Sequence, residues 1–158
     1  MAGARGGRGG ADGGGGRLWL MWPQTYMNES GRAVREAVRD LAIGADRVWL
    51  VYDELDLPLC RLRIRMGGSV AGHNGASSVM SSLGTAEFVR FRVGIGRPPE
   101  GKDPIRYVLG RFSRAEASRL SAVEGGVASA LEAALTSGLS RAMDLYNRSG
   151  SLGCEELP

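Results

Sequence analysis

Two short apolar runs separated by a segment of helical periodicity constrain the fold more than any other feature of the sequence. The runs are LWLMW at residues 18–22 and VWLVY at residues 48–52. Unbroken apolar runs of this length are typical of strands buried on both faces. Between them, apolar residues recur at helical spacing from Ala33 to Leu41, with charged residues on the other side. This pattern predicts an amphipathic helix between two buried strands.

The rest of the chain continues the alternation of strands and helices. Arginines alternate with apolar residues at positions 61–66 and again at 90–93, and a period of two predicts strands with the arginines on one face. The glycine-rich segment 67–75 predicts a loop that leads into a short helix from about residue 76 to 83. Ser113 followed by Glu116 is a capping box before a long helix. We therefore expect an α/β fold, a three-layer sandwich in which helices cover both faces of a mixed, mostly parallel sheet.

The ends of the chain differ in composition from its middle. Nine of the first seventeen residues are glycine, and such a segment buries too little apolar surface to offset its ordering entropy. We expect a disordered tail over residues 1–17, one domain over residues 18–148, and a flexible C-terminal tail over residues 149–158. No apolar run approaches the roughly 20 residues needed to cross a bilayer, so we expect a soluble protein without a membrane partner.

Charge and cysteine content favour no special class of protein. Of the net charge of +3, residues 1–17 contribute +2, so bulk charge alone does not indicate a nucleic-acid-binding protein. The two cysteines, Cys60 and Cys154, form neither a disulfide framework nor a metal-binding motif. A reducing, cytoplasmic setting fits this usage best.

Two polar segments directly follow the apolar runs. The first, PQTYMNESG at residues 23–31, lies between a strand and a helix, where α/β proteins bind ligands. Its alternative role is structural, with Asn28 or Ser30 capping the helix. The second, DELDLP at residues 53–58, carries three carboxylates. These carboxylates could orient a histidine, bind a metal ion or simply form a solvated turn.

Two further features come from the middle of the chain. The glycine-rich loop contains Asn74 and His73, the only histidine; its glycines permit close approach to a ligand, although a lone histidine is also common in purely structural roles. If the two arginine-bearing strands are neighbours, Arg63, Arg65 and Arg92 form a basic stripe that phosphates can follow. An ordinary solvent-exposed face is the equal alternative.

Five segments, in this order and at this spacing, resemble the bacterial-type peptidyl-tRNA hydrolases: PQTYMNESG, VYDELDLP, GGSVAGHNG, FRVGIGRP and YVLGRFS. The resemblance extends from about Leu18 to Arg148. It implies hydrolysis of the ester that joins a peptide to tRNA in peptidyl-tRNA, which releases the tRNA for recycling. It further implies no metal and no cofactor, with tRNA as the partner and a monomeric protein.

The resemblance assigns catalytic roles to four residues. Asn28 resembles the asparagine that binds the peptide end and positions water, and Asp53 the carboxylate that orients the catalytic histidine. His73 and Asn74 resemble the pair beside the scissile ester, where Asn74 helps to hold the water or the developing oxyanion. Expected substrate-binding residues are Tyr26, Met27, Gly72, Arg65 and Arg92, of which the two arginines contact tRNA phosphate.

One departure from the family pattern bears on activity. Family members begin with a strand running into Gly-Leu-Gly-Asn-Pro-Gly, followed by Thr-Arg-His-Asn, whose histidine is the general base; neither motif occurs in this sequence. We therefore expect the first strand of the fold to be missing, and impaired or absent turnover with some affinity for tRNA. The alternatives are a non-catalytic RNA-binding relative and a truncated remnant. A translation start assigned too far downstream gives the same sequence.

Overall fold

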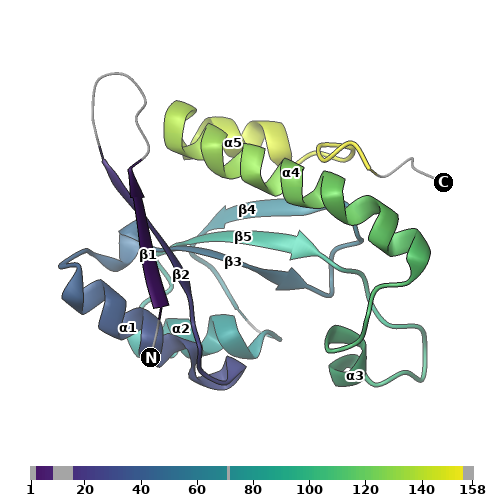
Figure 1. Ribbon diagram of the computed structural model, residues 1–158, viewed down its shortest axis with the longest axis horizontal. Helices are drawn as coiled ribbons and strands as arrows, with labels where there is room; N and C mark the ends of the chain where they lie inside the picture. The colour runs from purple at the N-terminus through teal and green to yellow at the C-terminus, as the bar shows by residue number, and fades with distance from the viewer. Residues whose placement is uncertain (1–2, 9–15, 71, 155–158) are drawn as a thin grey trace. The chain divides into compact units, whose positions relative to one another are not determined.

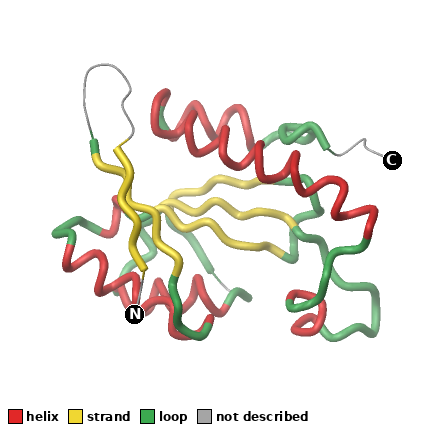
Figure 2. The backbone as a smooth tube through the Cα atoms, viewed as in Figure 1, coloured by secondary structure: helices red, strands yellow, loops and turns green. Residues whose placement is uncertain are grey.

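The computed structural model describes residues 3–8, 16–70 and 72–154, and its elements follow the predicted alternation closely (Figures 1 and 2). In chain order the elements are β1 (Gly3–Arg8), β2 (Arg17–Trp22), α1 (Ser30–Asp40), β3 (Trp49–Glu54), β4 (Leu62–Met66), α2 (Asn74–Leu83), β5 (Val89–Gly94), α3 (Pro104–Val108), α4 (Arg114–Ser137) and α5 (Leu139–Tyr146). Short 3₁₀ turns occur at Met27–Glu29 and Ala45–Arg47. Within these described ranges, no helix is long and apolar enough to cross a membrane.

Three strands form a mixed sheet in which β5 lies between β3 and β4 (Figure 1). The backbone amide of Val89 donates to Val48 O and that of Ile95 to Glu54 O, so β5 runs parallel to β3. The amides of Gly94 and Gly67 donate to Arg61 O and Phe88 O. The residue numbers of these two pairs run in opposite directions, so β4 is antiparallel to β5. The mixed sheet that the sequence predicts is therefore present.

The LWLMW segment is a strand, as predicted, but it is not buried on both faces. β2 pairs antiparallel with β1 in a separate two-stranded sheet, and Leu20 and Trp22 are 50% and 59% exposed. The prediction of burial is wrong because a two-stranded ribbon supplies too little surface to cover both faces of an apolar strand.

The N-terminal segment also differs from the expected disorder. Residues 3–8 form β1 and pair with β2 from Gly3 opposite Trp22 to Arg8 opposite Arg17. Antiparallel pairing uses backbone amides and carbonyls, so a glycine-rich sequence can form it wherever the edge of a partner strand is available. The other residues of the predicted tail, apart from 16 and 17, lie outside the described ranges.

Contacts divide the chain into two compact units, where the sequence predicted one domain over residues 18–148. The first unit contains the residues up to Leu50 and the segment Met66–Val89, and the second contains Val51–Arg65 and the residues from Arg90 onward. The boundaries fall inside β3, β4 and β5, the three strands of one sheet.

In the first unit, α1 and α2 pack backbone to backbone. The Gly31 amide donates to Ser78 Oγ at 3.0 Å, and a Cβ atom at Gly31 would lie only 2.0 Å from the Ser78 carbonyl oxygen. Ala33 and Val34 of α1, predicted to face inward, are buried, as is Val79 of α2. Close approach of the two helices therefore requires glycine at position 31.

In the second unit, the apolar face of β4 and β5 forms the core. Leu62, Ile64 and Phe91 are fully buried, which confirms the predicted alternation of apolar and arginine faces. α4 begins with the predicted capping box between Ser113 and Glu116. The buried residues Val123, Ala130 and Ala134 recur along one side of this helix.

The C-terminal segment is packed up to Cys154, whereas the sequence predicted a flexible tail over residues 149–158. Leu152 is buried and contacts the place where Gly126 would carry a Cβ atom. Cys154 is buried and forms a disulfide with Cys60, which corrects the expectation that these cysteines are unpaired. Sequence reasoning missed the pairing because 94 positions separate the two residues. Residues 155–158 lie outside the described part.

Candidate active site

In the first unit, the TYMN and GHNG segments lie against each other. The 3₁₀ turn Met27–Glu29 packs on α2, and Met27 Sδ lies 2.5 Å from the position that a Cβ atom of Gly75 would take. A residue with a side chain at position 75 would push Met27 away. The structure thus brings the turn with Met27 and Asn28 against the helix that begins at Asn74, two segments that the sequence assigned to one site.

His73 caps the helix that begins after it. Its Nδ1 atom accepts a hydrogen bond from the Ala76 amide at 3.0 Å, and its φ angle of −121° is extended. Since Nδ1 is the acceptor, the neutral ring carries its hydrogen on Nε2, which makes Nε2 a donor. The structural role that the sequence left open for His73 is therefore real.

Asn28 has no capping role, which removes the structural alternative for it. Glu29 occupies the N-cap position of α1 without a side-chain cap. Ser30, the other candidate cap, donates from Oγ to Met27 O at 2.8 Å. Asn28, Tyr26 and Asn74 are exposed. Their polar groups are thus presented at the surface where α1 and α2 begin.

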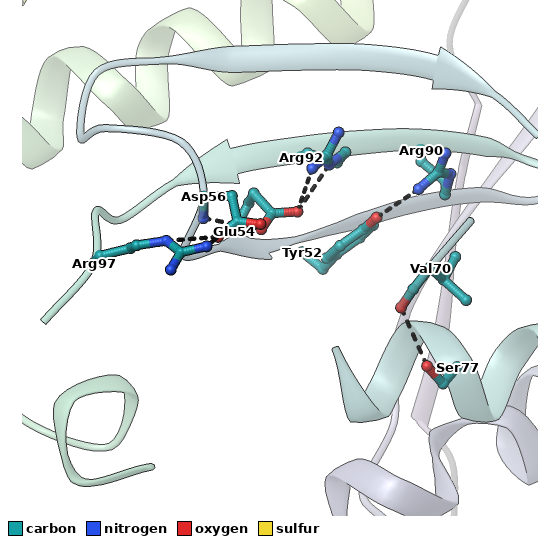
Figure 3. A network of polar contacts seen from close by, with 8 residues as sticks. All are labelled: Tyr52, Glu54, Asp56, Val70, Ser77, Arg90, Arg92 and Arg97. Carbon is teal, nitrogen blue, oxygen red and sulfur yellow. Dashed lines mark hydrogen bonds and ion pairs between the residues drawn. The ribbon is translucent and has the colours of Figure 1, made fainter. Parts of the chain in front are cut away.

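In the second unit, the DELDLP turn is joined to two arginines (Figure 3). Glu54 Oε2 accepts from Arg92 Nε at 2.8 Å and lies 2.7 Å from Arg92 Nη2. Glu54 Oε1 accepts from the Asp56 amide at 3.0 Å, and Asp56 forms an ion pair with Arg97 at 2.6 Å. Asp53 lies near the end of β3 and is half-buried. The turn is therefore held by ion pairs and is not merely solvated.

The carboxylates of this turn do not assemble a metal site. Within the described residues, no group of three or more His, Cys, Asp or Glu side chains has a geometry that holds a metal ion. Two carboxylates that the sequence offered as ligands, Glu54 and Asp56, instead bind arginines.

The arginine-bearing strands are neighbours, as the sequence hypothesis of a basic stripe required. The register of β4 and β5 places Arg63 opposite Arg92 and Arg65 opposite Arg90. Their surroundings differ, however. Arg90 is 5% exposed and donates to Tyr52 Oη at 3.1 Å, Arg92 is bound to Glu54, and Arg63 is half-buried. Of the two arginines assigned to phosphate, only Arg65 is exposed.

Sequence reasoning missed the partners of these arginines. Glu54, Tyr52 and Arg97 received no individual role, although Tyr52 and Glu54 share one face of β3 by their spacing of two. The order of strands, with β5 next to β3, is what brings that face to Arg90 and Arg92. The alternation was visible in the sequence, but the pairing of strands was not.

Comparisons with known proteins identify similar sequences and similar structures. The chain matches the family model for peptidyl-tRNA hydrolase over residues 4–152. It is 44% identical over 135 residues to the peptidyl-tRNA hydrolase of Desulfitobacterium hafniense, covering 85% of this chain and 73% of the relative. It is 46% identical over 136 residues to that of Geobacter sulfurreducens, covering 86% and 70%. The crystal structure of peptidyl-tRNA hydrolase from Acinetobacter baumannii superposes with a TM-score of 0.77 at 29% identity, covering 90% of this chain and 71% of that one. This likeness confirms the predicted α/β fold.

Proposed function

Because the chain belongs to the peptidyl-tRNA hydrolase family, we propose that it hydrolyses the ester bond between peptide and tRNA in peptidyl-tRNA. The product tRNA returns to translation. The observation that carries the proposal is the packing of Met27 against Gly75, because it holds an exposed asparagine from each of two separate segments at the start of α1 and α2. Both asparagines lie in the segments that resemble the family's catalytic motifs.

We assign a separate role in the hydrolysis of the ester to Asn28, Asn74 and His73. Asn28, together with Tyr26 and Met27, binds the peptide end of the substrate. Asn74 holds the attacking water or the oxyanion that develops on the ester carbonyl, since its amide supplies both a donor and an acceptor. His73 donates from Nε2, because Nδ1 is occupied by the Ala76 amide. Gly72, with a φ of +91°, lets the backbone approach the substrate.

Asp53, Arg65 and Arg92 belong to the second unit, and the proposal gives each of them a role. Asp53 corresponds by resemblance to the carboxylate that orients the family's catalytic histidine, and the Thr-Arg-His-Asn segment that carries this histidine does not occur in the sequence. Arg65 contacts tRNA phosphate from its exposed position on β4. Arg92 reaches phosphate only by sharing or leaving the Glu54 carboxylate, so we assign the larger share of phosphate binding to Arg65. No metal or cofactor has a role in this scheme.

Turnover by the 158-residue polypeptide is proposed to be low. His73 is its single histidine, and the lone pair of its Nδ1 atom already accepts the hydrogen of the Ala76 amide. General base catalysis typically contributes ~10²–10⁴-fold, so we expect a rate lower by about that factor than the rate of a relative that contains the Thr-Arg-His-Asn segment. We further propose a monomeric protein, which light scattering after size exclusion tests. We propose a cytoplasmic setting from membership of the family alone, because the Cys60–Cys154 disulfide removes the argument from cysteine usage.

The test measures hydrolysis of an N-acetylated aminoacyl-tRNA and, in parallel, binding of the same tRNA over a range of salt concentrations. We expect slow hydrolysis that Asn28→Ala and Asn74→Ala abolish, with Ser81→Ala on the exposed side of α2 as the matched control. Binding without any hydrolysis would instead identify an RNA-binding relative. Hydrolysis that is insensitive to both asparagines would contradict the assigned site, and absence of both binding and hydrolysis would contradict the function.

A further inference from the structure

An open cavity of about 610 Å³ in the second unit is lined by residues of α3 and of the loops before and after it. We call it the α3 cavity and define it by its lining residues, which are Gly101, Lys102, Asp103, Arg106, Tyr107, Gly110 and Arg111. Its volume lies within the range of ordinary ligand sites, about 300–1,000 Å³. None of its lining residues belongs to the proposed ester-hydrolysing site, so that site does not explain why charged side chains gather around the cavity.

The cavity is lined by three cations and one carboxylate. The carboxylate, Asp103, accepts a hydrogen bond from the Ile105 amide at 2.9 Å and lies 3.9 Å from Arg106 Nε. In the part of the chain that the structure describes, Lys102 and Arg111 form no ion pair. Two positive charges therefore remain without a counter-charge in one cavity, which favours an anionic ligand.

Local contacts fix the backbone that carries these cations. The Lys102 amide donates to Pro99 O at 3.0 Å and the Gly110 amide to Tyr107 O at 3.1 Å. Tyr107 Oη donates to Ile95 O at 2.9 Å, which ties α3 to the end of β5. Burial, and then the negative charge of Glu116, raise the pKa of Tyr107 above its ordinary value of 10.0, which favours the protonated hydroxyl that donates this hydrogen bond.

We propose that the α3 cavity binds a phosphate group of the RNA backbone through Lys102 and Arg111. A guanidinium can bind two phosphate oxygens at once, and an ammonium adds a compact point charge. The cavity volume also leaves room for the ribose attached to the phosphate. This inference rests on the proposed function, because it adds a second phosphate-binding position, separate from Arg65, for the same tRNA.

The first experiment measures tRNA binding by the full chain with the double substitution Lys102→Ala and Arg111→Ala. Both side chains are exposed and have no ion-pair partner within the described residues, so we expect the melting temperature to be unchanged. We expect about tenfold weaker tRNA binding at 0.1 M salt. The slope of the logarithm of the binding constant against the logarithm of the salt concentration should be smaller by about 0.7–0.9 for each phosphate that the variant no longer neutralises. Arg141→Ala, an exposed arginine on α5 in the same unit, is the matched control and should leave the slope unchanged.

A second experiment separates this inference from the proposed function. Inorganic phosphate is titrated into the wild-type chain while the amide signals of Gly101 and Gly110 are followed by NMR. Saturable shifts that the double variant lacks support the phosphate site, even if the chain proves not to hydrolyse peptidyl-tRNA. Unchanged affinity and slope in the double variant, while the wild type binds tRNA, would overturn the proposal. So would displacement of phosphate by an acidic peptide but not by tRNA.

Discussion

His73 Nδ1 lies 3.0 Å from the Ala76 amide nitrogen and accepts its hydrogen bond. The GHNG segment therefore contains a histidine whose one nitrogen stabilises α2 while the other is a donor. A single substitution to alanine removes both functions at once, but a polar replacement can separate them.

We predict that His73→Ala lowers the free energy of unfolding by about 1 kcal/mol, the usual cost of losing an N-cap. His73→Asn should keep the stability, because an asparagine oxygen can accept the same amide hydrogen, and should still lose activity because the Nε2 donor is gone. Urea unfolding and the hydrolysis assay measure the two effects. Full activity in His73→Asn would show that Nε2 has no part in the reaction.

Gly31 and Gly125 give a matched pair of helical glycines. At Gly31 a Cβ atom would meet the Ser78 carbonyl at 2.0 Å, whereas at Gly125 no atom lies within 4 Å. We expect Gly31→Ala to cost about 2 kcal/mol through overpacking, and Gly125→Ala to stabilise the protein by about 0.5–1 kcal/mol through helix propensity. Thermal and urea unfolding compare the two. Equal effects would contradict the close packing of α1 on α2.

The Glu54–Arg92 pair should contribute to stability, because the two side chains are only 15% and 26% exposed. We expect Arg92→Ala to lower the free energy of unfolding by about 1–3 kcal/mol, since it leaves a mostly buried carboxylate without its partner. Adding Glu54→Gln to the Arg92→Ala variant should recover part of that loss, because it removes the unpaired charge. A double-mutant cycle in urea measures the coupling. Arg97→Ala is the control, because its pair with Asp56 is exposed and should contribute less than about 1 kcal/mol.

The capping box of α4 predicts a dependence of stability on pH. Hydrogen bonds from the Ser113 amide and hydroxyl, in that order of effect, lower the pKa of Glu116 below its ordinary value of 4.5. A lowered pKa contributes stability above the ordinary value, and that contribution is lost as the pH falls through the lowered one. Glu116→Gln should therefore be less stable than wild type at pH 7, with a difference that shrinks in acid. Glu124→Gln, at an exposed position of the same helix, should show no such trend in urea unfolding at several pH values.

The disulfide between Cys60 and Cys154 should stabilise the second unit, because it closes a loop of 94 positions and so restricts the unfolded chain. We expect Cys154→Ser to lower the free energy of unfolding by about 2–4 kcal/mol. A reducing agent should destabilise the wild type by a similar amount and leave Cys154→Ser unchanged. If reduction has no effect on the wild type, the pair does not form in solution.

The sequence predicted which segments contribute residues to the candidate site, but it did not predict which of these residues contact one another. The motifs pointed to the two segments that contain Asn28 and Asn74, and periodicity predicted the alternation of arginines on β4 and β5. Neither predicted the engagement of Arg92 by Glu54, because it depends on β5 lying beside β3 in the sheet. The α3 cavity was missed for a different reason: its lining residues lie close together in the sequence, at positions 101–111, but they follow no periodicity that would have indicated a cavity.

The sequence by itself determined where most strands and helices lie and how α4 is capped, because periodicity and capping are interactions between residues a few positions apart. Only the tertiary structure decided that β2 is exposed, that Cys60 joins Cys154, and that Met27 packs on Gly75. Each of these depends on which distant segments meet. Contacts between distant segments are determined by how the chain packs around its cores, and this packing leaves no local pattern in the sequence.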